Sequence, residues 1–223
     1  MGTLLLGDPL RPLAVALILN VGGPMTQQTL YRRLRAMRDH FTPPPGLAWP
    51  EISDGKIVMM MSPRPRHQFT AKWVSRQLDG QLPEGYFAFE ATDTDDEGLG
   101  KLRVPDLLVC AGEAMQTDGP LDPREIVLAI EIVSPSNPEN DYRDKARDYP
   151  AMGIPHYLIL DPRDGTWTYQ WEIVRAEGRP AYDNRLHLPY GEPVTVATDL
   201  GTWKIETGDL PQYSAKDMGL SPE

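Results

Sequence analysis

One segment restricts the fold of this chain more than any other. Residues 126–133 (IVLAIEIV) are apolar at every position except Glu131. A near-continuous apolar run of this length is typical of a strand that is covered on both faces. An ionised carboxylate in such a strand costs several kcal/mol unless it is paired or binds a cation. Glu131 is therefore expected to be half of a buried ion pair or a ligand of a metal ion.

Helices and further strands surround this segment. Apolar residues at helical spacing predict helices over residues 26–38, 66–78 and 141–152, the first of them capped by Thr26. Period-two patterns and turn residues predict the remaining elements: a hairpin over 49–61 that turns at 53–55, strands at 86–91, 102–111 and 156–160, an acid-rich loop at 92–100, and a strand meander over 166–210. This order predicts an α/β fold, a mixed β-sheet flanked by helices with extra strands after the core.

The length and the cysteine content limit the kind of protein. A chain of 223 residues suits one domain, which we place at residues 25–212, between an N-terminal tail or extended start (1–24) and a C-terminal tail (213–223). A single cysteine, Cys110, excludes an intrachain disulfide and a cysteine-based zinc cluster, and it fits a cytoplasmic protein. The apolar stretch at 13–19 is too short to span a bilayer, so no membrane partner is expected.

The charge argues against one class of nucleic-acid protein. With 22 Lys and Arg against 32 Asp and Glu, the net charge is −10, which excludes a protein that coats nucleic acid through bulk charge. Two segments nevertheless contain basic residues and no acid: Arg32, Arg33, Arg35 and Arg38 in residues 26–38, and Arg64, Arg66, Lys72 and Arg76 in residues 62–78. Such segments either supply phosphate contacts or are solvated helix faces.

Three charged residues occupy informative positions. Asp106 follows Pro105 at the start of an apolar stretch, Glu131 interrupts the buried strand, and Lys145 lies on the helix that follows. Asp141, Lys145 and Tyr149 are spaced by four, so they share one helical face. The Lys145 ammonium then either faces the strand ends near the two acids or forms an ordinary exposed pair with Asp141.

Four motifs in order carry a resemblance to a known family. The stretches PEISDGKIVMMMSPRPRH, RVPDLLV, LAIEIVSPSN and DYRDKARDYPAMGIPHYLILDP span residues 50–162. Their succession resembles the Uma-type family of putative restriction endonucleases, within the PD-(D/E)XK nuclease superfamily. The resemblance implies a restriction-endonuclease-like core in which Asp106 and Glu131 bind Mg²⁺ or Mn²⁺. The superfamily's usual lysine falls at Val133, and Lys145 resembles its migrated replacement.

The resemblance also implies a function and supporting residues. It implies a Mg²⁺-dependent DNA endonuclease in which Lys145 stabilises the transition state or helps to deprotonate water, and Arg64, Arg66, Lys72 and Arg76 contact the DNA backbone. Glu51 and His67 match the opening motifs, although Glu51 would also suit the start of a hairpin and His67 a helix cap. Glu90 is a further candidate ligand. Two other functions remain possible: a catalytically idle binding or scaffold module, and a hydrolase of RNA or another phosphoester. The protein could also form a homodimer.

Overall fold

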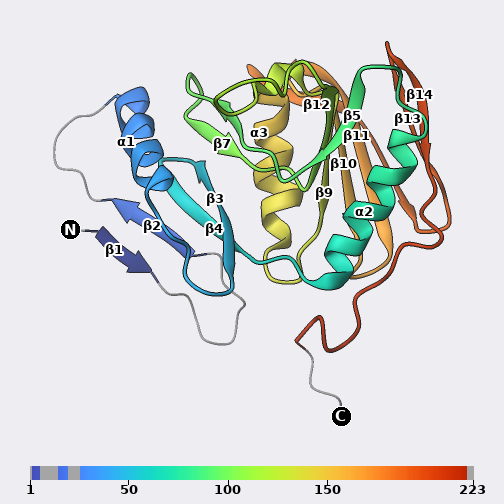
Figure 1. The fold of residues 1–223 in the computed structure, drawn as a ribbon, viewed down its shortest axis with the longest axis horizontal. Coiled ribbons are helices and arrows are strands. Elements are labelled where there is room, and N and C mark those ends of the chain that lie inside the picture. Colours follow the sequence, from blue (N-terminus) through green and yellow to red (C-terminus); the bar gives the residue numbers. More distant parts are fainter. Residues whose placement is uncertain (1, 6–14, 20–25, 220–223) are drawn as a thin grey trace.

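A computed structural model describes residues 2–5, 15–19 and 26–219 of the chain (Figure 1). Its helical elements are α1 (Gln27–Asp39), α2 (Pro65–Asp79), a 3-10 turn (Pro123–Glu125), and a π-helical segment (Asn140–Lys145) that continues directly into α3 (Ala146–Ala151). Among the described residues, no helix is long and apolar enough to cross a membrane.

The central sheet is mixed, as predicted. Its strand order is β12 (Arg179–Pro189), β11 (Thr166–Ala176), β10 (His156–Asp161), β9 (Leu128–Ile132), β8 (Leu107–Ala111) and β5 (Tyr86–Glu90). Strands β9 and β10 run parallel, and the other neighbours run antiparallel. The predicted α/β fold, with extra strands after the core, is confirmed.

A second sheet lies beside the first. Its order is β1 (Gly2–Leu5), β2 (Val15–Leu19), β4 (Lys56–Met61), β3 (Leu47–Ser53), β7 (Lys101–Arg103) and β6 (Thr94–Asp96), and a separate ribbon consists of β13 (Val194–Thr198) and β14 (Gly201–Ile205). The segment expected to be a tail or extended start thus contributes β1 and β2, and β2 pairs with β4. Its other residues lie outside the described ranges.

Alternation along the buried strands produces two apolar layers. On β9, Leu128, Ile130 and Ile132 pack with α2 and the β13–β14 ribbon, whereas Ala129 and Val133 pack with α3 on the opposite face. In Figure 1, α3 lies between the two sheets and α2 covers the outer face of the central sheet. Glu131 belongs to the same face as Ala129, so the fold directs its carboxylate toward α3 and the second sheet.

The structure confirms two predictions about local structure, the cap of α1 and the turn of the β3–β4 hairpin. The Thr26 hydroxyl accepts a hydrogen bond from the Thr29 backbone N–H at 3.2 Å and caps α1. The β3–β4 hairpin turns at Asp54 and Gly55, whose φ values are +50° and +70°. Positive φ at both central residues is the conformation of a tight two-residue hairpin loop, so the predicted turn is confirmed.

The single strand predicted over residues 102–111 is wrong. Lys101–Arg103 forms β7 of the second sheet, and Leu107–Ala111 forms β8 of the central sheet. Pro105 lies between them and has no backbone N–H to donate to either ladder, so pairing ends there and the chain crosses from one sheet to the other. Asp106 therefore lies at the junction of the two sheets.

Two further elements differ from the expectation. The helix predicted over residues 141–152 begins with the π-helical segment, a geometry that is rare and is found frequently at functional sites. Gly153, with a φ of +85°, follows the C-terminal end of α3 as the sequence predicts, whereas Pro150 lies inside the helix. The acid-rich loop at 92–100 contains the short strand β6.

Candidate active site

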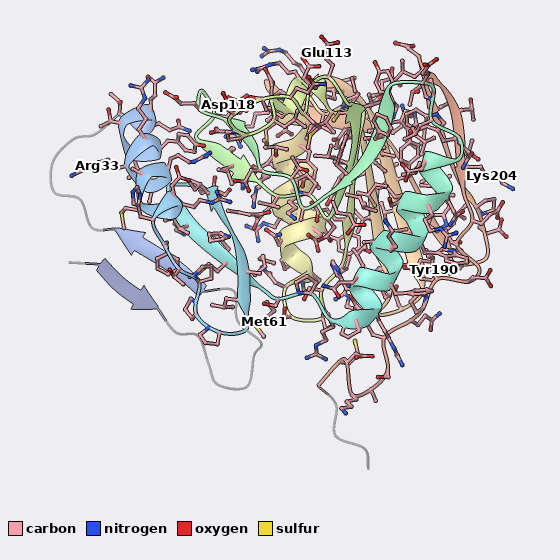
Figure 2. The ribbon with its side chains drawn as sticks, in the orientation of Figure 1. Arg33, Met61, Glu113, Asp118, Tyr190 and Lys204 are labelled. Atoms are coloured by element: carbon pink, nitrogen blue, oxygen red, sulfur yellow. The ribbon has the colours of Figure 1, made fainter. Side chains whose placement is uncertain are left out.

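A pocket of about 340 Å³ lies where the N-terminal end of α2, the π-helical segment and the sheet junction meet. Met61, which is labelled in Figure 2, belongs to its wall. All three predicted catalytic residues and all three supporting candidates line this pocket: Glu51, His67, Glu90, Asp106, Glu131 and Lys145. Residues separated by almost one hundred positions in the sequence are therefore brought together at one place.

Glu131 is half of a buried ion pair. The Lys145 Nζ lies 2.7 Å from Glu131 Oε2, and the Tyr149 hydroxyl donates a hydrogen bond to Glu131 Oε1. The side chains of Glu131 and Lys145 are only 1% and 5% exposed. Lys145 also lies 3.8 Å from Asp141 Oδ1, so the predicted common face of Asp141, Lys145 and Tyr149 is confirmed. The alternative of an ordinary exposed Asp141–Lys145 pair is wrong.

Asp106 is held beside Glu131 by two hydrogen bonds. Its Oδ2 accepts from the backbone N–H of Ile132, at 2.8 Å, and lies 3.1 Å from His67 Nε2. Because Ile132 directly follows Glu131, the first bond ties Asp106 to the strand that carries the second acid. A quarter of the Asp106 side chain remains exposed, whereas Glu131 is enclosed. His67 thus contacts Asp106, and no side-chain cap of α2 is formed.

A β-bulge directs Glu51 into the same cluster. The register between β3 and β4 shifts between Ala48 and Glu51, which re-aims the side chains that follow. Glu51 accepts hydrogen bonds from Arg103 Nη1 at 2.7 Å and from the Val104 N–H at 3.0 Å, and its Oε1 lies 3.4 Å from Lys145 Nζ. Glu51 therefore bridges Arg103 and Lys145.

The sequence analysis missed Arg103 and Asp148. Arg103 is fully buried and joins Glu51 to Asp148, whose Oδ2 accepts from its guanidinium. Ser53 donates to Asp148 as well, at 3.1 Å. A charged residue between Leu102 and Val104 is the same signal that made Glu131 conspicuous, and it would have identified Arg103.

The cluster contains more carboxylate than cation. Burial, together with the nearby Asp106 and Asp141, raises the pKa of Glu131 well above its usual range, although Lys145 opposes the shift. Burial likewise raises the pKa of Asp141 to about 7. Burial disfavours the Lys145 ammonium, but the facing carboxylates, Glu131 first, raise its pKa above the ordinary value, so it stays charged.

The pKa values of Asp106 and Glu51 are shifted in the opposite direction from those of Glu131 and Asp141. Burial raises the pKa of both carboxyls, but their cationic neighbours outweigh it and keep both pKa values below the ordinary range. For Asp106 the main neighbour is His67, whose own pKa is raised by Asp106 against the effect of burial. For Glu51 the neighbours are Lys145 and Arg103. Asp106 is therefore a permanent anion on the pocket wall at neutral pH.

The four predicted DNA-backbone residues are all exposed and lie on α2 or at its N-terminal cap. Arg64 lines the pocket, and Arg66 pairs with Asp217, which lines it too. Lys72 and Arg76 are exposed further along α2, and Lys72 lies 3.9 Å from Glu90. The Glu90 side chain is 47% exposed, so Glu90 lies at the edge of the pocket, where it pairs with Lys72 and not with the buried cluster.

The basic face of α1 pairs with acids of the 92–100 loop. Arg32, Arg35 and Arg38 form ion pairs with Glu97, Asp95 and Asp93, at 2.7, 3.0 and 2.6 Å. From the sequence, these arginines were expected either to contact phosphates or to form a solvated helix face, and no pairing with the 92–100 loop was predicted. In the fold the two neutralise each other, and α1 is attached to the second sheet through them.

The donor set fits a hard divalent cation with few protein ligands. Within the described ranges, no three His, Cys, Asp or Glu side chains form a metal-binding group. Mg²⁺ is commonly bound through one or two carboxylates while it keeps several waters, so three protein ligands are not required. Asp106 offers a carboxylate that is one quarter exposed, and Glu131 on the neighbouring strand β9 offers a second one that is enclosed. These oxygen donors suit Mg²⁺ or Mn²⁺.

The chain matches the model of a known protein family. The model of the Uma2 family, described as "Putative restriction endonuclease", matches residues 43–207. The chain belongs to the Uma2 family. The match contains Glu51, His67, Asp106, Glu131 and Lys145, so the whole carboxylate–lysine cluster lies within the part that defines the family. No curated protein matches the chain.

A solved structure supports the fold of this Uma2-family chain. Four chains of known structure match, among them a protein from Anabaena variabilis described as "a putative nuclease belonging to DUF820". That match has a TM-score of 0.53 and 17% sequence identity, and it covers 87% of this chain and 97% of the other. At this identity the likeness shows a shared nuclease-like fold.

Proposed function

We propose that this protein is a Mg²⁺- or Mn²⁺-dependent endonuclease that hydrolyses phosphodiester bonds in DNA. One observation carries the proposal: the buried Glu131–Lys145 pair opens into the same pocket as the half-buried anion Asp106. A buried carboxylate–lysine pair is costly in a core that needs only packing, so its place on a pocket wall supports a role in chemistry.

Each residue of the cluster has a distinct proposed role. Asp106 and Glu131 hold the cation, which when bound activates a water molecule and polarises the phosphate. Lys145 is the ammonium nearest to these acids, and it stabilises the negative charge that develops on the phosphate. Because three carboxylates surround Lys145, it remains protonated and is not the base that deprotonates water.

The remaining residues position these groups. His67 fixes the orientation of Asp106 through its hydrogen bond, and Glu51 holds Lys145 against Glu131 while Arg103 and the Val104 N–H anchor Glu51 in turn. Preorganised groups of this kind act without further rearrangement during the reaction. Arg64 and Arg66, at the pocket mouth, are the proposed contacts to the DNA backbone.

A second candidate is a nuclease-fold module that binds phosphodiesters without cleaving them. One observation favours it: both Glu131 oxygens already have protein partners, Lys145 and Tyr149. If the cation does not compete successfully with Lys145, the pair remains closed and the pocket only binds. Cleavage and metal binding must therefore be measured separately.

The test compares substitutions that preserve shape. Asp106→Asn and Glu131→Gln remove one charge each. Both are expected to lower the rate at which supercoiled plasmid DNA is nicked in Mg²⁺ or Mn²⁺ by at least about a hundredfold, because each loses several kcal/mol of transition-state stabilisation. Asp118→Asn is the matched control, because Asp118 is exposed, is not part of the pocket wall, and lies near the top of the view in Figure 2, well above Met61 of that wall. Nicking that persists in both site variants would refute the assignment.

Two further measurements separate the alternatives. Mn²⁺ binding, followed by electron paramagnetic resonance, is expected to weaken in Asp106→Asn and to be unchanged in Asp118→Asn. Metal binding without cleavage of any nucleic acid would favour the binding module. The unmutated protein could instead cleave RNA and not DNA, with this activity lost in Asp106→Asn. That result would support the proposed catalytic residues but identify RNA as the substrate.

A further inference from the structure

Residues 212–217 contact the side chains of Arg64 and Arg66 beside the pocket. Arg64 Nη1 donates to the Asp217 carbonyl at 2.7 Å and to the Lys216 carbonyl at 3.4 Å, and Arg66 Nη1 donates to the Gln212 carbonyl at 2.9 Å. These contacts join residues about 150 positions apart in the sequence. In Figure 1 this segment passes below the N-terminal end of α2.

One carboxylate of this segment faces both guanidinium groups. Asp217 Oδ2 lies 2.9 Å from Arg66 Nη1, and Asp217 Oδ1 lies 3.9 Å from Arg64 Nη1. Two arginines that face one oxyanion are the arrangement by which proteins bind a phosphate group. Asp217 therefore stands where a phosphate oxygen would be bound by the same pair.

The segment is built to hold that carboxylate in place. The Ser214 hydroxyl and backbone N–H donate to Asp217 Oδ2 at 2.7 and 2.9 Å, and the Met218 N–H donates to the Ser214 carbonyl at 3.0 Å. We call residues 214–219 the C-terminal turn. It is attached to the body of the protein at Tyr213, whose N–H donates to the Pro162 carbonyl at 2.7 Å. Because the hydrogen bonds that shape the turn lie within residues 214–219, the turn can be displaced from the arginines without unfolding the core.

The turn also forms part of the pocket wall. Asp217, Met218 and Gly219 line the pocket together with Asp106, Glu131 and Lys145. We infer that the C-terminal turn is an intramolecular competitor of the phosphate backbone: Asp217 occupies the Arg64–Arg66 phosphate site, and substrate must displace it to reach the carboxylate cluster. This inference rests on the proposed function, because it names what regulates access to the same site.

The contacts are of a strength that a substrate can overcome. The side chains of Arg64 and Arg66 are 51% and 46% exposed, and exposed ion pairs contribute little in water. A DNA backbone offers both arginines a full negative charge on each phosphate, whereas Asp217 offers one carboxylate to the two. The competition therefore lowers affinity by a modest factor and does not close the site permanently.

The test measures DNA affinity in the full-length protein without divalent metal. Asp217→Asn is expected to bind a short fluorescein-labelled DNA duplex, in EDTA, about fivefold more tightly than Asp209→Asn, which corresponds to about 1 kcal/mol. Asp209 is the matched control, since it is exposed, is not part of the pocket wall and carries the same charge. Equal affinities of the two variants would overturn the inference, because general charge would then explain any gain.

A second measurement keeps this inference separate from the proposed function. Hydrogen exchange of the peptide that contains residues 214–219 is expected to quicken when pyrophosphate is added to the unmutated protein, because a turn released from Arg64 and Arg66 opens its internal hydrogen bonds more often. The Arg64→Gln/Arg66→Gln variant is expected to exchange quickly with and without pyrophosphate. The nicking assay in Mg²⁺ or Mn²⁺ decides the proposed function separately; if no variant binds DNA in EDTA, the exchange result alone decides this inference. Exchange that pyrophosphate leaves unchanged in the unmutated protein overturns the inference.

Discussion

Replacing Lys145 with Met tests whether the buried cluster is held together by charge. The substitution keeps an unbranched chain of similar length but removes an ammonium that has three carboxylate oxygens within 4 Å: those of Glu131, Glu51 and Asp141, at 2.7, 3.4 and 3.8 Å. Removing one partner of a buried pair costs about 3–5 kcal/mol. Glu51 keeps Arg103, whereas Glu131 retains only a neutral donor in Tyr149. We expect the free energy of unfolding to fall by about 3 kcal/mol at pH 8.

The expected loss depends on pH, because Glu131 can take up a proton. Burial and the neighbouring carboxylates already raise the pKa of Glu131, and removal of Lys145 raises it further. A group whose pKa is raised by folding contributes stability at pH values below its unfolded pKa, and this contribution is lost as the pH rises through the folded value. Lys145→Met should therefore lose less stability at pH 5 than at pH 8. Adding Glu131→Gln should restore about 2 kcal/mol at pH 8, since the uncompensated charge is gone.

The assay is urea denaturation followed by circular dichroism at pH 5 and pH 8. It compares the unmutated protein, Lys145→Met, Glu131→Gln and the double variant, which together form a thermodynamic cycle. Lys204→Met is the matched control, because Lys204 pairs with Glu206 at 2.7 Å but is 55% exposed, and it should cost under about 0.5 kcal/mol. Additive single effects in the cycle, or a Lys145→Met loss no larger than that of Lys204→Met, would refute the reasoning.

Two further predictions concern groups outside the catalytic set. Burial raises the pKa of Asp148, but Arg103 outweighs it and lowers the pKa to about 2, so this group's stabilisation is present above the unfolded pKa and is lost as the pH falls. About 1 kcal/mol of stability should disappear between pH 5 and pH 3 through Asp148, and urea titrations of Asp148→Asn should lack that increment; an unchanged acid limb would contradict it. Cys110 is buried, and burial raises its thiol pKa to about 11, so Ellman's reagent should label it only after unfolding; rapid labelling of the folded protein would contradict this.

The sequence predicts the composition of the site better than its geometry. An acid inside an apolar strand requires a partner or a cation on physical grounds alone, and the structure shows Glu131 in a buried ion pair; that Lys145 is its partner was not predicted. The i,i+4 spacing on a helix placed Lys145 and Tyr149 on one face, and both contact Glu131. Hydrophobic periodicity also predicted the mixed sheet and its covering helices, because burial on both faces leaves few alternatives.

Long-range registers could not be predicted in the same way. Glu51 reaches Lys145 because a β-bulge shifts the β3–β4 register, and nothing local in the sequence defines which residues pair across a bulge. The division of residues 102–111 between two sheets depends on where Pro105 ends one ladder, which apolar periodicity does not reveal. The contacts of Arg64 with the C-terminal turn join residues about 150 positions apart, and no local pattern predicts such a contact.

The distribution of charge explains how so acidic a chain can present a phosphate-binding site. A net charge of −10 would repel DNA if it were spread evenly over the surface. Much of the acid is instead neutralised locally, since the 92–100 loop pairs with the arginines of α1, and Arg103 neutralises the buried Asp148. Arg66 is in turn matched by Asp217, an acid on a turn that can be displaced. On the proposed function, the protein does not need a basic surface to approach DNA. A substrate phosphate would replace the Asp217 carboxylate at Arg64 and Arg66, so we expect the affinity for DNA to be modest and dependent on salt.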